Sequence, residues 1–529
     1  MMVNMKKILF LFLALFSFSG MVYSDITWST PVAISTALTT ASDPHVVIDV
    51  NGNATAAWVE NNAIKASSLP FGGSWSTPVT LSNVSNTSST PRLGVDSSGN
   101  VTALWIENTQ IESATLPFGG SWGAETSPIS GTGASNPSFA VDASGNAVAV
   151  WVRSGFIESS TRISGTWSLV SVLSATNSSN PHVAISSFGT AMAVWHSVVS
   201  GNDLIVTDIL TISSNTWAAT KNVFSGTATF NHNYPKVAID ANGNAAVAWF
   251  RYNFFGGNNY QNVQVITSAL SQGASAWGIP NFLSNQGIRN PADLTIKLKF
   301  DTSGDALIFW TNSYDGELFT IESSVKLVGG VWQLSSMVDS PSLYSFGIDS
   351  AIAAANALLV EMTWDGVSNI NIRSIQTDST NPGSQFFTIP NQISTGSDNA
   401  YPSCGFSVNG SALNAVVVWL NFNGSNVVIN ASSGTDSVIG PPSSVSATQS
   451  NINYGVYDDF INTITWSAST DPNVIQYNVY RNGVIVAELP ASTLQFVDHN
   501  QVQSGHVTYG VAGFTGNDRQ SAIITFTLF

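Results

Sequence analysis

A tandem repeat constrains the fold of this 529-residue chain more than any other feature. Each copy reads Asp or Ser, two residues, Gly, a short polar residue, four residues and Trp, and the copies recur about every 45–60 residues. Six copies end at Trp58, Trp105, Trp151, Trp195, Trp249 and Trp310, and two degenerate copies end at Trp364 and Trp419. A period of this length with four short strands per copy is typical of an all-β fold, the β-propeller.

A second aromatic motif, W-x-x-P-x-x-L-S in its clearest form, follows each copy except the last. It begins at Trp75, Trp122, Trp167, Trp217, Trp277, Trp332 and, in the seventh copy, Phe387. An unattached example, Trp28–Ser35, stands before the first copy. Because a closed ring has no exposed sheet edge, we expect this segment to complete the last blade as its outermost strand. The sequence therefore predicts an eight-bladed propeller, with seven blades as the alternative count.

The Asp and Gly of each copy predict a tight turn between two strands, since Asp accepts backbone N–H bonds and Gly adopts positive φ. Such a short turn cannot wrap a calcium ion. The G-x-S-x-G match at Gly119–Gly123 occupies the position in the second copy that Phe71–Ser76 occupies in the first. It is therefore an ordinary hairpin of the repeat, and we predict no nucleophile there. Zinc, P-loop and dinucleotide motifs are absent from the sequence. We predict no cofactor, no metal and no catalytic residue.

The chain divides into four segments. Lys6 and Lys7, an apolar run over 8–18 and small residues before Asp25 indicate a signal peptide over residues 1–24. We expect the propeller over 25–435, a linker over 436–442 and a separate domain over 443–529. The protein should be exported to the extracellular space, the cell surface or the periplasm, without a transmembrane span.

The repeats resemble those of secreted bacterial β-propeller proteins with the motif D-x-x-G-N-A-x-A-x-W, as at Asp142–Trp151. This resemblance covers residues 25–435 and implies the fold and export, but no activity. The C-terminal segment resembles a fibronectin type III domain through Ile464–Trp466, Tyr477–Gly483 and Tyr509–Ala512. That resemblance implies an immunoglobulin-like β-sandwich with Trp466 in its core and Tyr509 at a tyrosine corner.

Charge and cysteine content narrow the choice of partners. Charged residues make up 9% of the chain, and its formal net charge of −16 disfavours nucleic acid and anionic membranes. Cys404 is the single cysteine, so no internal disulfide forms, and its place in the repeat matches Val46 and Leu93. We therefore expect a buried, unreactive thiol. We also expect a monomer.

Candidate binding residues share one position in the repeat. The residue after the repeat's Pro is His45, Arg92, Ser138, His182, Lys236 or Ser403. In a four-stranded meander this position shares one face with the loops after each Trp, which open on residues such as Glu60 and Glu107. The fifth copy carries an insertion there, residues 251–262. We predict a ligand site formed by His45, Arg92, His182, Lys236, Arg251, Tyr252, Phe254, Phe255 and Tyr260. Two other interpretations stay open. The charged residues could simply be solvated at loop ends, and the insertion could pack on the edge of its own blade.

These observations predict an exported, non-enzymatic recognition or adhesion protein that binds a glycan or protein through one propeller face. Two alternatives stay open: a carbohydrate-active enzyme, hydrolase or lyase, with its site at the propeller mouth, and a purely structural surface protein. Two carboxylates about 5–10 Å apart in a deep axial pocket would indicate a glycosidase. A shallow aromatic face without such a pair would indicate a binding protein.

Overall fold

The computed structural model of the protein is an all-β structure with two compact units, Ile26–Asp436 and a C-terminal unit, Ser437–Phe529. It describes residues 26–528 except 37–38, 125–127, 188, 228, 256–258, 285–286, 290–294, 314–318, 339–343, 354–355, 365–369, 379–390, 395–398, 410–411, 438–440, 454–457, 472–473, 483, 502–506, 516–518 and 522. The predicted signal peptide, 1–24, lies outside these residues. Among them, no helix has the length and hydrophobicity that a membrane span requires.

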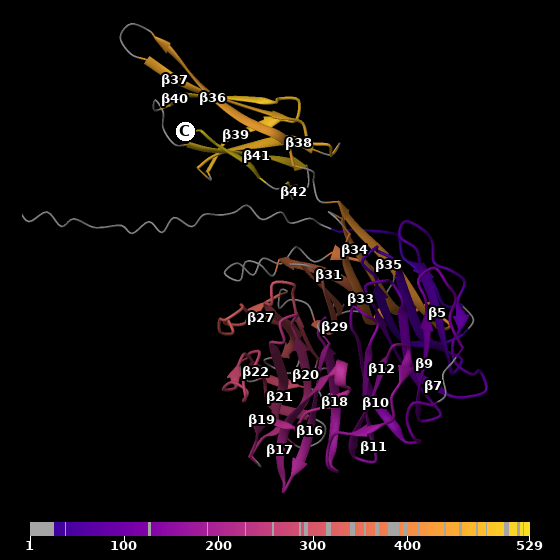
Figure 1. The fold of residues 1–529 in the computed structure, drawn as a ribbon. Coiled ribbons are helices and arrows are strands. Elements are labelled where there is room, and N and C mark those ends of the chain that lie inside the picture. The colour runs from indigo at the N-terminus through magenta and orange to yellow at the C-terminus, as the bar shows by residue number, and fades with distance from the viewer. Residues whose placement is uncertain are drawn as a thin grey trace, which may run out of the picture. The chain divides into compact units, whose positions relative to one another are not determined.

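Eight antiparallel sheets form the described part of the first unit, and we number them in chain order (Figure 1). Sheets 1 and 2 contain β3 (Ala41–Ile48), β4 (Ala54–Glu60), β5 (Ala63–Leu69) and β6 (Val79–Thr80), then β7 (Ser88–Val95), β8 (Val101–Glu107) and β9 (Gln110–Leu116). Sheet 3 contains β10 (Ala134–Val141), β11 (Ala147–Arg153), β12 (Phe156–Ile163), β13 (Thr166–Trp167) and β14 (Ser171–Val172). Sheet 4 contains β15 (Ser178–Ile185), β16 (Thr190–Val199), β17 (Asn202–Thr211), β18 (Thr216–Trp217) and β19 (Lys221–Ser225), with a 3₁₀ turn at Ile212–Ser214.

Sheets 5 to 8 continue the same meander. Sheet 5 contains β20 (Asn231–Ile239), β21 (Ala245–Phe255), β22 (Asn259–Leu270), β23 (Asn281–Phe282) and β24 (Gly287–Arg289). Sheet 6 contains β25 (Ile296–Phe300), β26 (Ala306–Ser313), β27 (Phe319–Lys326) and β28 (Ser336–Met337). Sheet 7 contains β29 (Tyr344–Ala353), β30 (Asn356–Trp364), β31 (Ile370–Asp378) and β32 (Asn391–Gln392). Sheet 8 contains β33 (Asn399–Asn409), β34 (Ala412–Phe422), β35 (Val427–Ser437), β1 (Thr27–Trp28) and β2 (Val32–Ala33).

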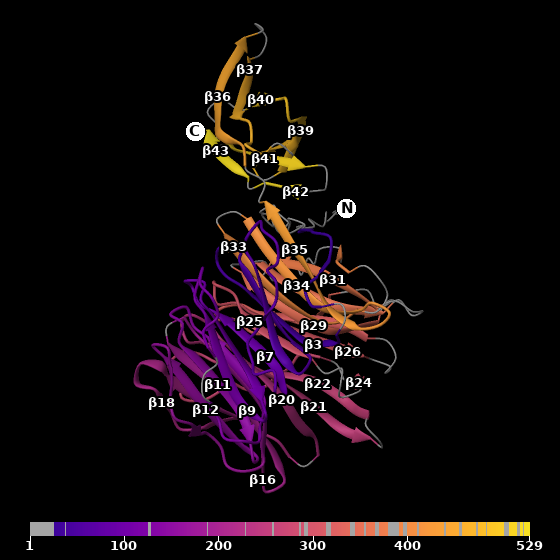
Figure 2. The same ribbon diagram turned by 90° about the vertical axis from the view of Figure 1, so that its right-hand side faces the viewer.

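The N-terminal segment completes sheet 8. Thr27 pairs with Thr435 and Val32 with Ala431, so that β1 and β2 run antiparallel to β35. Sheet 8 in turn lies beside sheet 1 through β33 and β3 (Figure 2). The edge of β35 is therefore paired within the chain, in the place where the unattached aromatic motif was predicted.

The Asp turns hold the first two strands of a sheet together. In sheet 3, Asp142 Oδ1 accepts the backbone N–H groups of Ser144 and Asn146 at 2.8 and 2.9 Å, and Asp142 Oδ2 accepts Asn146 Nδ2 at 2.9 Å. Gly145 has a φ of 80°, which disfavours any residue with a Cβ. The Asp carboxylate of this turn is therefore engaged by hydrogen bonds from residues of the same turn.

The repeated tryptophans fill the space between neighbouring sheets. Those that are at most 1% exposed are Trp58, Trp105, Trp151, Trp195, Trp249, Trp310 and Trp419. Trp105 of sheet 2, for example, packs against Ala57 and Ala66 of sheet 1. Small residues on the facing strands make room for the indole rings, so each ring joins two sheets into one hydrophobic cluster.

The C-terminal unit is built from two sheets around one core. One sheet contains β36 (Ser443–Asn453), β37 (Asp458–Ser467) and β40 (Gln495–Gln501). The other contains β38 (Val474–Arg481), β39 (Val484–Pro490), β41 (Val507–Thr515), β42 (Arg519–Gln520) and β43 (Ile524–Leu528). Trp466, Tyr477 and Tyr509 lie in the shared core. The Tyr509 hydroxyl donates to Asp498 Oδ2 at 2.7 Å, which satisfies this buried polar group.

Candidate functional site

A bulge in the first strand of six sheets aims one side chain of each sheet into a shared cavity. In sheets 1 to 5 and in sheet 8 the pairing register breaks at the residue before Pro and at the Pro itself, for example between Ser42 and His45. The residues before Pro have φ values of 48–56° and are Asp43, Thr90, Asn136, Asn180, Tyr234 and Tyr401. Bulges of this kind redirect the side chain that follows. The redirected residues are His45, Arg92, Ser138, His182, Lys236 and Ser403.

Sheets 6 and 7 supply the remaining two positions of this ring. His45 pairs with the residue before the core Trp58, and in the same register Lys297 pairs with Phe309, the residue before Trp310. In sheet 7 the position belongs to Asp349, whose carboxylate accepts the N–H of Cys404 just as Ser403 accepts the N–H of Val46. We call the eight residues His45, Arg92, Ser138, His182, Lys236, Lys297, Asp349 and Ser403 the axial ring.

Axial residues that carry a lone pair hold the next sheet in place. The N–H of Leu93 donates to His45 Nδ1 at 3.3 Å, and the N–H of Val237 donates to His182 Nδ1 at 3.3 Å. Ser138, Asp349 and Ser403 accept equivalent bonds at 3.1, 3.0 and 3.2 Å. Arg92, Lys236 and Lys297 have no acceptor atom, so they cannot form this bond. Their charged groups are left for other partners.

The axial ring lines a cavity of about 850 Å³ together with Tyr234 and Lys299. Four of the chain's 16 Lys and Arg residues line it, namely Arg92, Lys236, Lys297 and Lys299. Asp349 is the one carboxylate among the described lining residues, and Lys297 Nζ lies 2.8 Å from its Oδ1. Within the described chain, no carboxylate forms a salt bridge with Arg92, Lys236 or Lys299. The cavity is therefore strongly basic inside an acidic protein.

Burial changes the protonation of these groups. Burial, followed by the nearby charges of Lys297, Arg92 and Lys299, lowers the pKa of Lys236 to about 8. Burial and then Arg92 lower the pKa of His45 to about 3, and burial and Lys236 lower that of His182 well below its usual value. Both imidazoles are thus neutral at neutral pH. Because Nδ1 accepts a backbone N–H in each, the ring proton lies on Nε2, which can donate to a ligand.

Two further groups complete the chemistry of the cavity. Burial, and then a hydrogen bond to Tyr260, raise the pKa of Tyr234 to about 12, so its hydroxyl keeps its proton. Burial acts to raise the pKa of Asp349, but Lys297 and the N–H of Cys404 outweigh it, and the pKa falls below its usual value. Cys404 itself is buried, as predicted, and burial raises the pKa of its thiol well above the usual range.

The insertion at 251–262 does not form the predicted aromatic binding loop. Its residues extend β21 and β22 into a longer hairpin, in which Phe254 pairs with Tyr260 and Phe255 with Asn259. Tyr252 and Tyr260 stack with ring centroids 4.0 Å apart and are 3% and 6% exposed, inside the cluster that contains Trp310. The side chains of Phe254 and Phe255 lie outside the described residues. Strand alternation turns the two tyrosines inward, which corrects the prediction.

Arg251 is also separated from the axial cavity. Its guanidinium lies over the ring of Phe230, 3.4 Å from the centroid, and 5.3 Å from the centroid of Phe282. The acidic residues expected beside it have structural roles as well, because Glu60 and Glu107 accept the indole N–H groups of Trp58 and Trp105 at 2.8 and 3.1 Å. Of the predicted site residues, the cavity brings together His45, Arg92, His182 and Lys236.

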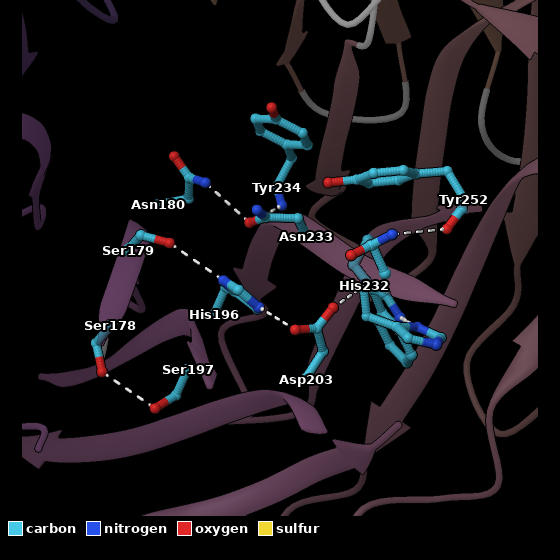
Figure 3. A network of polar contacts seen from close by, with 12 residues as sticks. Ser178, Ser179, Asn180, His196, Ser197, Asp203, His232, Asn233, Tyr234 and Tyr252 are labelled. Carbon is cyan, nitrogen blue, oxygen red and sulfur yellow. Dashed lines mark hydrogen bonds and ion pairs between the residues drawn. The ribbon is translucent and has the colours of Figure 1, made fainter. Parts of the chain in front are cut away.

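A polar network beside the cavity joins sheets 4 and 5 (Figure 3). Ser179 Oγ lies 3.1 Å from His196 Nδ1, and His196 Nε2 lies 3.0 Å from Asp203 Oδ1. Asp203 Oδ2 accepts the N–H of His232 on the next sheet at 2.8 Å. Serines occupy the register position of Ser179 in sheets 1 to 3, where Ser42, Ser89 and Ser135 face apolar partners. This serine belongs to the repeat, and we assign the network to joining the sheets.

Sequence reasoning missed Tyr234, Lys297, Lys299 and Asp349. Lys297 and Asp349 were missed because the Pro that precedes the axial residue in six copies is absent from the described first strands of sheets 6 and 7. Counting back from Trp310 through the turn at Asp301–Asp305 would have placed Lys297 at the axial position. Sheet 7 has Glu361 at the position of the core Trp, and not Trp364 as the repeat predicted, so no comparable landmark pointed to Asp349.

Comparisons with known proteins yield structural similarity alone. No family model and no curated protein matches the chain. Similar solved structures include an ulvan lyase (9% identity, 77% of this chain and 95% of that chain, TM-score 0.42). They also include the β-propeller domain of the Trilobed protease from Pyrococcus furiosus (10%, 65% and 93%, 0.38) and an arabinanase from Penicillium chrysogenum (10%, 57% and 93%, 0.32). The described chain is thus an all-β protein with propeller-like neighbours.

These neighbours contradict the prediction of a non-enzymatic recognition protein. Most of them are carbohydrate-active enzymes, including polysaccharide lyases, the arabinanase and a neuraminidase-like protein. At TM-scores below 0.5 the similarity carries no argument for any particular activity. An activity for this chain has to be inferred from the axial cavity itself.

Proposed function

We propose that the first unit is a carbohydrate-active enzyme, a lyase that cleaves an acidic polysaccharide at the axial cavity. The observation that carries this proposal is the concentration of Arg92, Lys236, Lys297 and Lys299 in one cavity of a protein with a net charge of −16. A basic pocket inside an acidic protein favours a ligand with negative groups, because the charges are desolvated and their attraction is strong.

A lyase agrees better with the lining residues than a hydrolase. Glycosidases generally use two carboxyl groups about 5–10 Å apart, one as acid and one as base or nucleophile. Among the described residues the cavity has one carboxylate, Asp349, and Lys297 is paired with it. Cleavage by β-elimination needs no second carboxylate. It needs a base, an acid and positive groups around the sugar's carboxylate.

The chemistry assigns a role to each group. Arg92 and Lys297, with the Nε2–H groups of His45 and His182, would hold the uronate carboxylate and stabilise the charge that develops on it. Lys236, whose pKa is about 8, would take the proton from the adjacent ring carbon as a neutral amine. The electrons of that C–H bond form a C=C bond, the glycosidic C–O bond breaks, and the Tyr234 hydroxyl protonates the departing oxygen.

The proposal also covers the architecture around the cavity. We infer one closed eight-bladed propeller, supported by the pairing of β1 with β35 and by the bond from Val46 N–H to Ser403 Oγ between sheets 1 and 8. The core around Trp466 and Tyr509 supports a fibronectin type III-like C-terminal domain. The sequence pattern of residues 1–24, together with the repeat motif, supports export and a relation to secreted bacterial propeller proteins.

An assay on uronate polymers tests this function. The purified chain is incubated with alginate, pectate, glucuronan and hyaluronate, and the ultraviolet absorbance of the new C=C bond is followed. We expect turnover of at least one polymer, a kcat/KM that rises with pH through about 8 as Lys236 loses its proton, and a loss of at least about 100-fold in Lys236→Met.

Lys221→Met is the matched control, because Lys221 lies on β19 and does not line the cavity. It should leave kcat/KM unchanged. Reducing ends released without the absorbance would show a hydrolase instead. No product from any of the polymers, or equal losses in Lys236→Met and Lys221→Met, would refute the proposed site.

A further inference from the structure

A hydrogen bond between neighbouring sheets recurs at the outer tryptophans. The indole N–H of Trp167 donates to Ser113 Oγ of the preceding sheet at 2.8 Å. Trp277 donates in the same way to Thr207 at 3.1 Å, and Trp28 donates to Ser374 at 2.9 Å. These hydroxyl residues share one register position, because each pairs with the residue one before the core Trp position of its sheet. The bond therefore joins the outer part of one sheet to the preceding sheet.

The bond is not formed in every pair of sheets, since Trp332 Nε1 and Thr267 Oγ1 have no hydrogen-bond partner among the described residues. Sheet 1 differs in lacking the hydroxyl group itself. At the same register position it has Ala66, which pairs with Ala57 and is fully buried. The facing tryptophan is Trp122 of sheet 2, which packs against the cluster that contains Ala66 and is half-buried. Alanine offers no acceptor, and within the described part of the chain Trp122 forms no hydrogen bond. Its indole N–H is therefore available to a ligand.

A cavity of about 670 Å³ opens at this position between sheets 1 and 2. Trp122, Phe118, Pro70 and Pro117 supply flat apolar surfaces, and the serine and threonine residues of the wall are Thr55, Ser67, Ser68, Ser76, Thr80 and Ser121. None of the described lining residues is Lys, Arg or His. The single carboxylate, Asp49, is engaged by the N–H groups of Asn51 and Asn53 inside its turn.

We propose that this inter-sheet cavity binds a neutral pyranose residue. The apolar face of a pyranose matches an aromatic ring, while its hydroxyl groups suit the Trp122 N–H and the serine and threonine hydroxyls. The absence of basic lining groups separates this ligand from the uronate expected in the axial cavity. The site is independent of the proposed lyase activity and adds a second place at which the protein holds carbohydrate.

Ala431 provides an internal comparison. It has the register position of Ala66 in sheet 8, since Val32 pairs with Ala431 as Val79 pairs with Ala66. Ala431 packs in the cluster that contains Trp75, and neither residue lines the cavity of sheets 1 and 2. A change at Ala431 therefore reproduces the chemistry of a change at Ala66 without touching the proposed site.

The test measures binding of methyl glycosides of glucose, galactose, mannose and N-acetylglucosamine to the full chain by calorimetry and by saturation-transfer NMR. We expect at least one to bind. Ala66→Ser should weaken it at least tenfold, because the new hydroxyl accepts the Trp122 N–H and occupies part of the cavity. Trp122→Ala should abolish binding. Ala431→Ser and Arg92→Ala should leave it unchanged.

Three results would overturn the proposal: no binding of any of these glycosides, equal weakening by Ala66→Ser and Ala431→Ser, or loss of binding in Arg92→Ala with retention in Trp122→Ala. Melting curves of each variant identify misfolding, and Ala66→Ser serves as the decisive variant if Trp122→Ala does not fold. The lyase assay is separate, so failure of either proposal is recognised independently. If a bound glycoside also inhibits polymer turnover, the site holds the substrate chain; if it does not, the site holds another glycan.

Discussion

At the scale of single residues, the chemical type of each axial side chain decides what it does. Imidazole, hydroxyl and carboxylate groups accept the N–H of the next sheet and so stabilise the ring, as His45 and Asp349 do. Guanidinium and ammonium groups cannot accept it, so Arg92 and Lys236 face the cavity with their charges uncompensated by such a bond. One structural position therefore serves both for joining sheets and for binding ligand.

The buried histidines predict how stability depends on pH. The pKa of His45 is about 3 in the folded chain and about 6.5 when unfolded, and that of His232 is lowered to about 4, chiefly by burial. Between these values the unfolded chain binds more protons, so the free energy of unfolding is greatest above about pH 6.5 and falls as the pH decreases toward 3. His45→Asn, which keeps an acceptor for the Leu93 N–H, should flatten this dependence.

Urea unfolding of the first unit between about pH 4 and about pH 7 checks this expectation. His499→Asn in the C-terminal unit is the control and should leave the pH dependence of the first unit unchanged. A wild-type chain whose unfolding free energy does not fall on acidification would contradict the assigned neutral state of the buried histidines.

At the scale of elements, two very short strands cover the edge of the last sheet. β1 and β2 contribute four strand residues in all, yet Thr27, Trp28, Val32 and Ala33 each pair with β35. Ile34 and Ser35 add backbone and side-chain bonds to Ile429 at 2.8 Å. Ile26 is buried among residues of sheets 7 and 8. A segment this short is effective because it fills an edge that the rest of the chain leaves open.

Removal of residues 25–35 should therefore expose the edge of β35. We expect loss of cooperative unfolding, aggregation, or both, because an unpaired strand edge is a template for association between chains. Calorimetry and light scattering measure the two effects. A truncated chain that melts as the full chain does and stays monomeric would show that the segment is not needed for closure.

At the scale of the whole molecule, the two units have different tasks in the proposed function. Every described residue assigned to the axial cavity and to the cavity between sheets 1 and 2 belongs to Ile26–Asp436. The C-terminal unit has its own core around Trp466 and Tyr509. The first unit should therefore contain the full catalytic and binding machinery.

A chain that ends at Asp436 tests this division. We expect it to retain the melting transition of the first unit, the kcat/KM on soluble uronate polymer and the affinity for the neutral glycoside. The matched chain 437–529 should bind neither ligand. A large fall in kcat/KM with an unchanged melting temperature would assign part of the substrate site to the C-terminal unit.

The sequence by itself determined the features that repeat locally. The Asp turns and the unattached strand at Trp28–Ser35 each follow from turn chemistry or from the aromatic motif, and both patterns recur in many copies. The same periodicity placed His45, Arg92, His182 and Lys236 at one position of the repeat. Their common position depends only on the sequence within a single copy.

Only the tertiary structure decided which groups meet. Lys297, Lys299 and Asp349 reach the cavity through the register of sheets 6 and 7, which the Pro landmark does not reveal. Tyr252 and Tyr260 enter a core because the insertion continues two strands instead of forming a loop. The indole N–H of Trp122 has no hydrogen-bond partner within the described chain because the facing residue, in another sheet, is Ala66. Contacts between sheets join residues that lie far apart in the chain, and no local pattern encodes them.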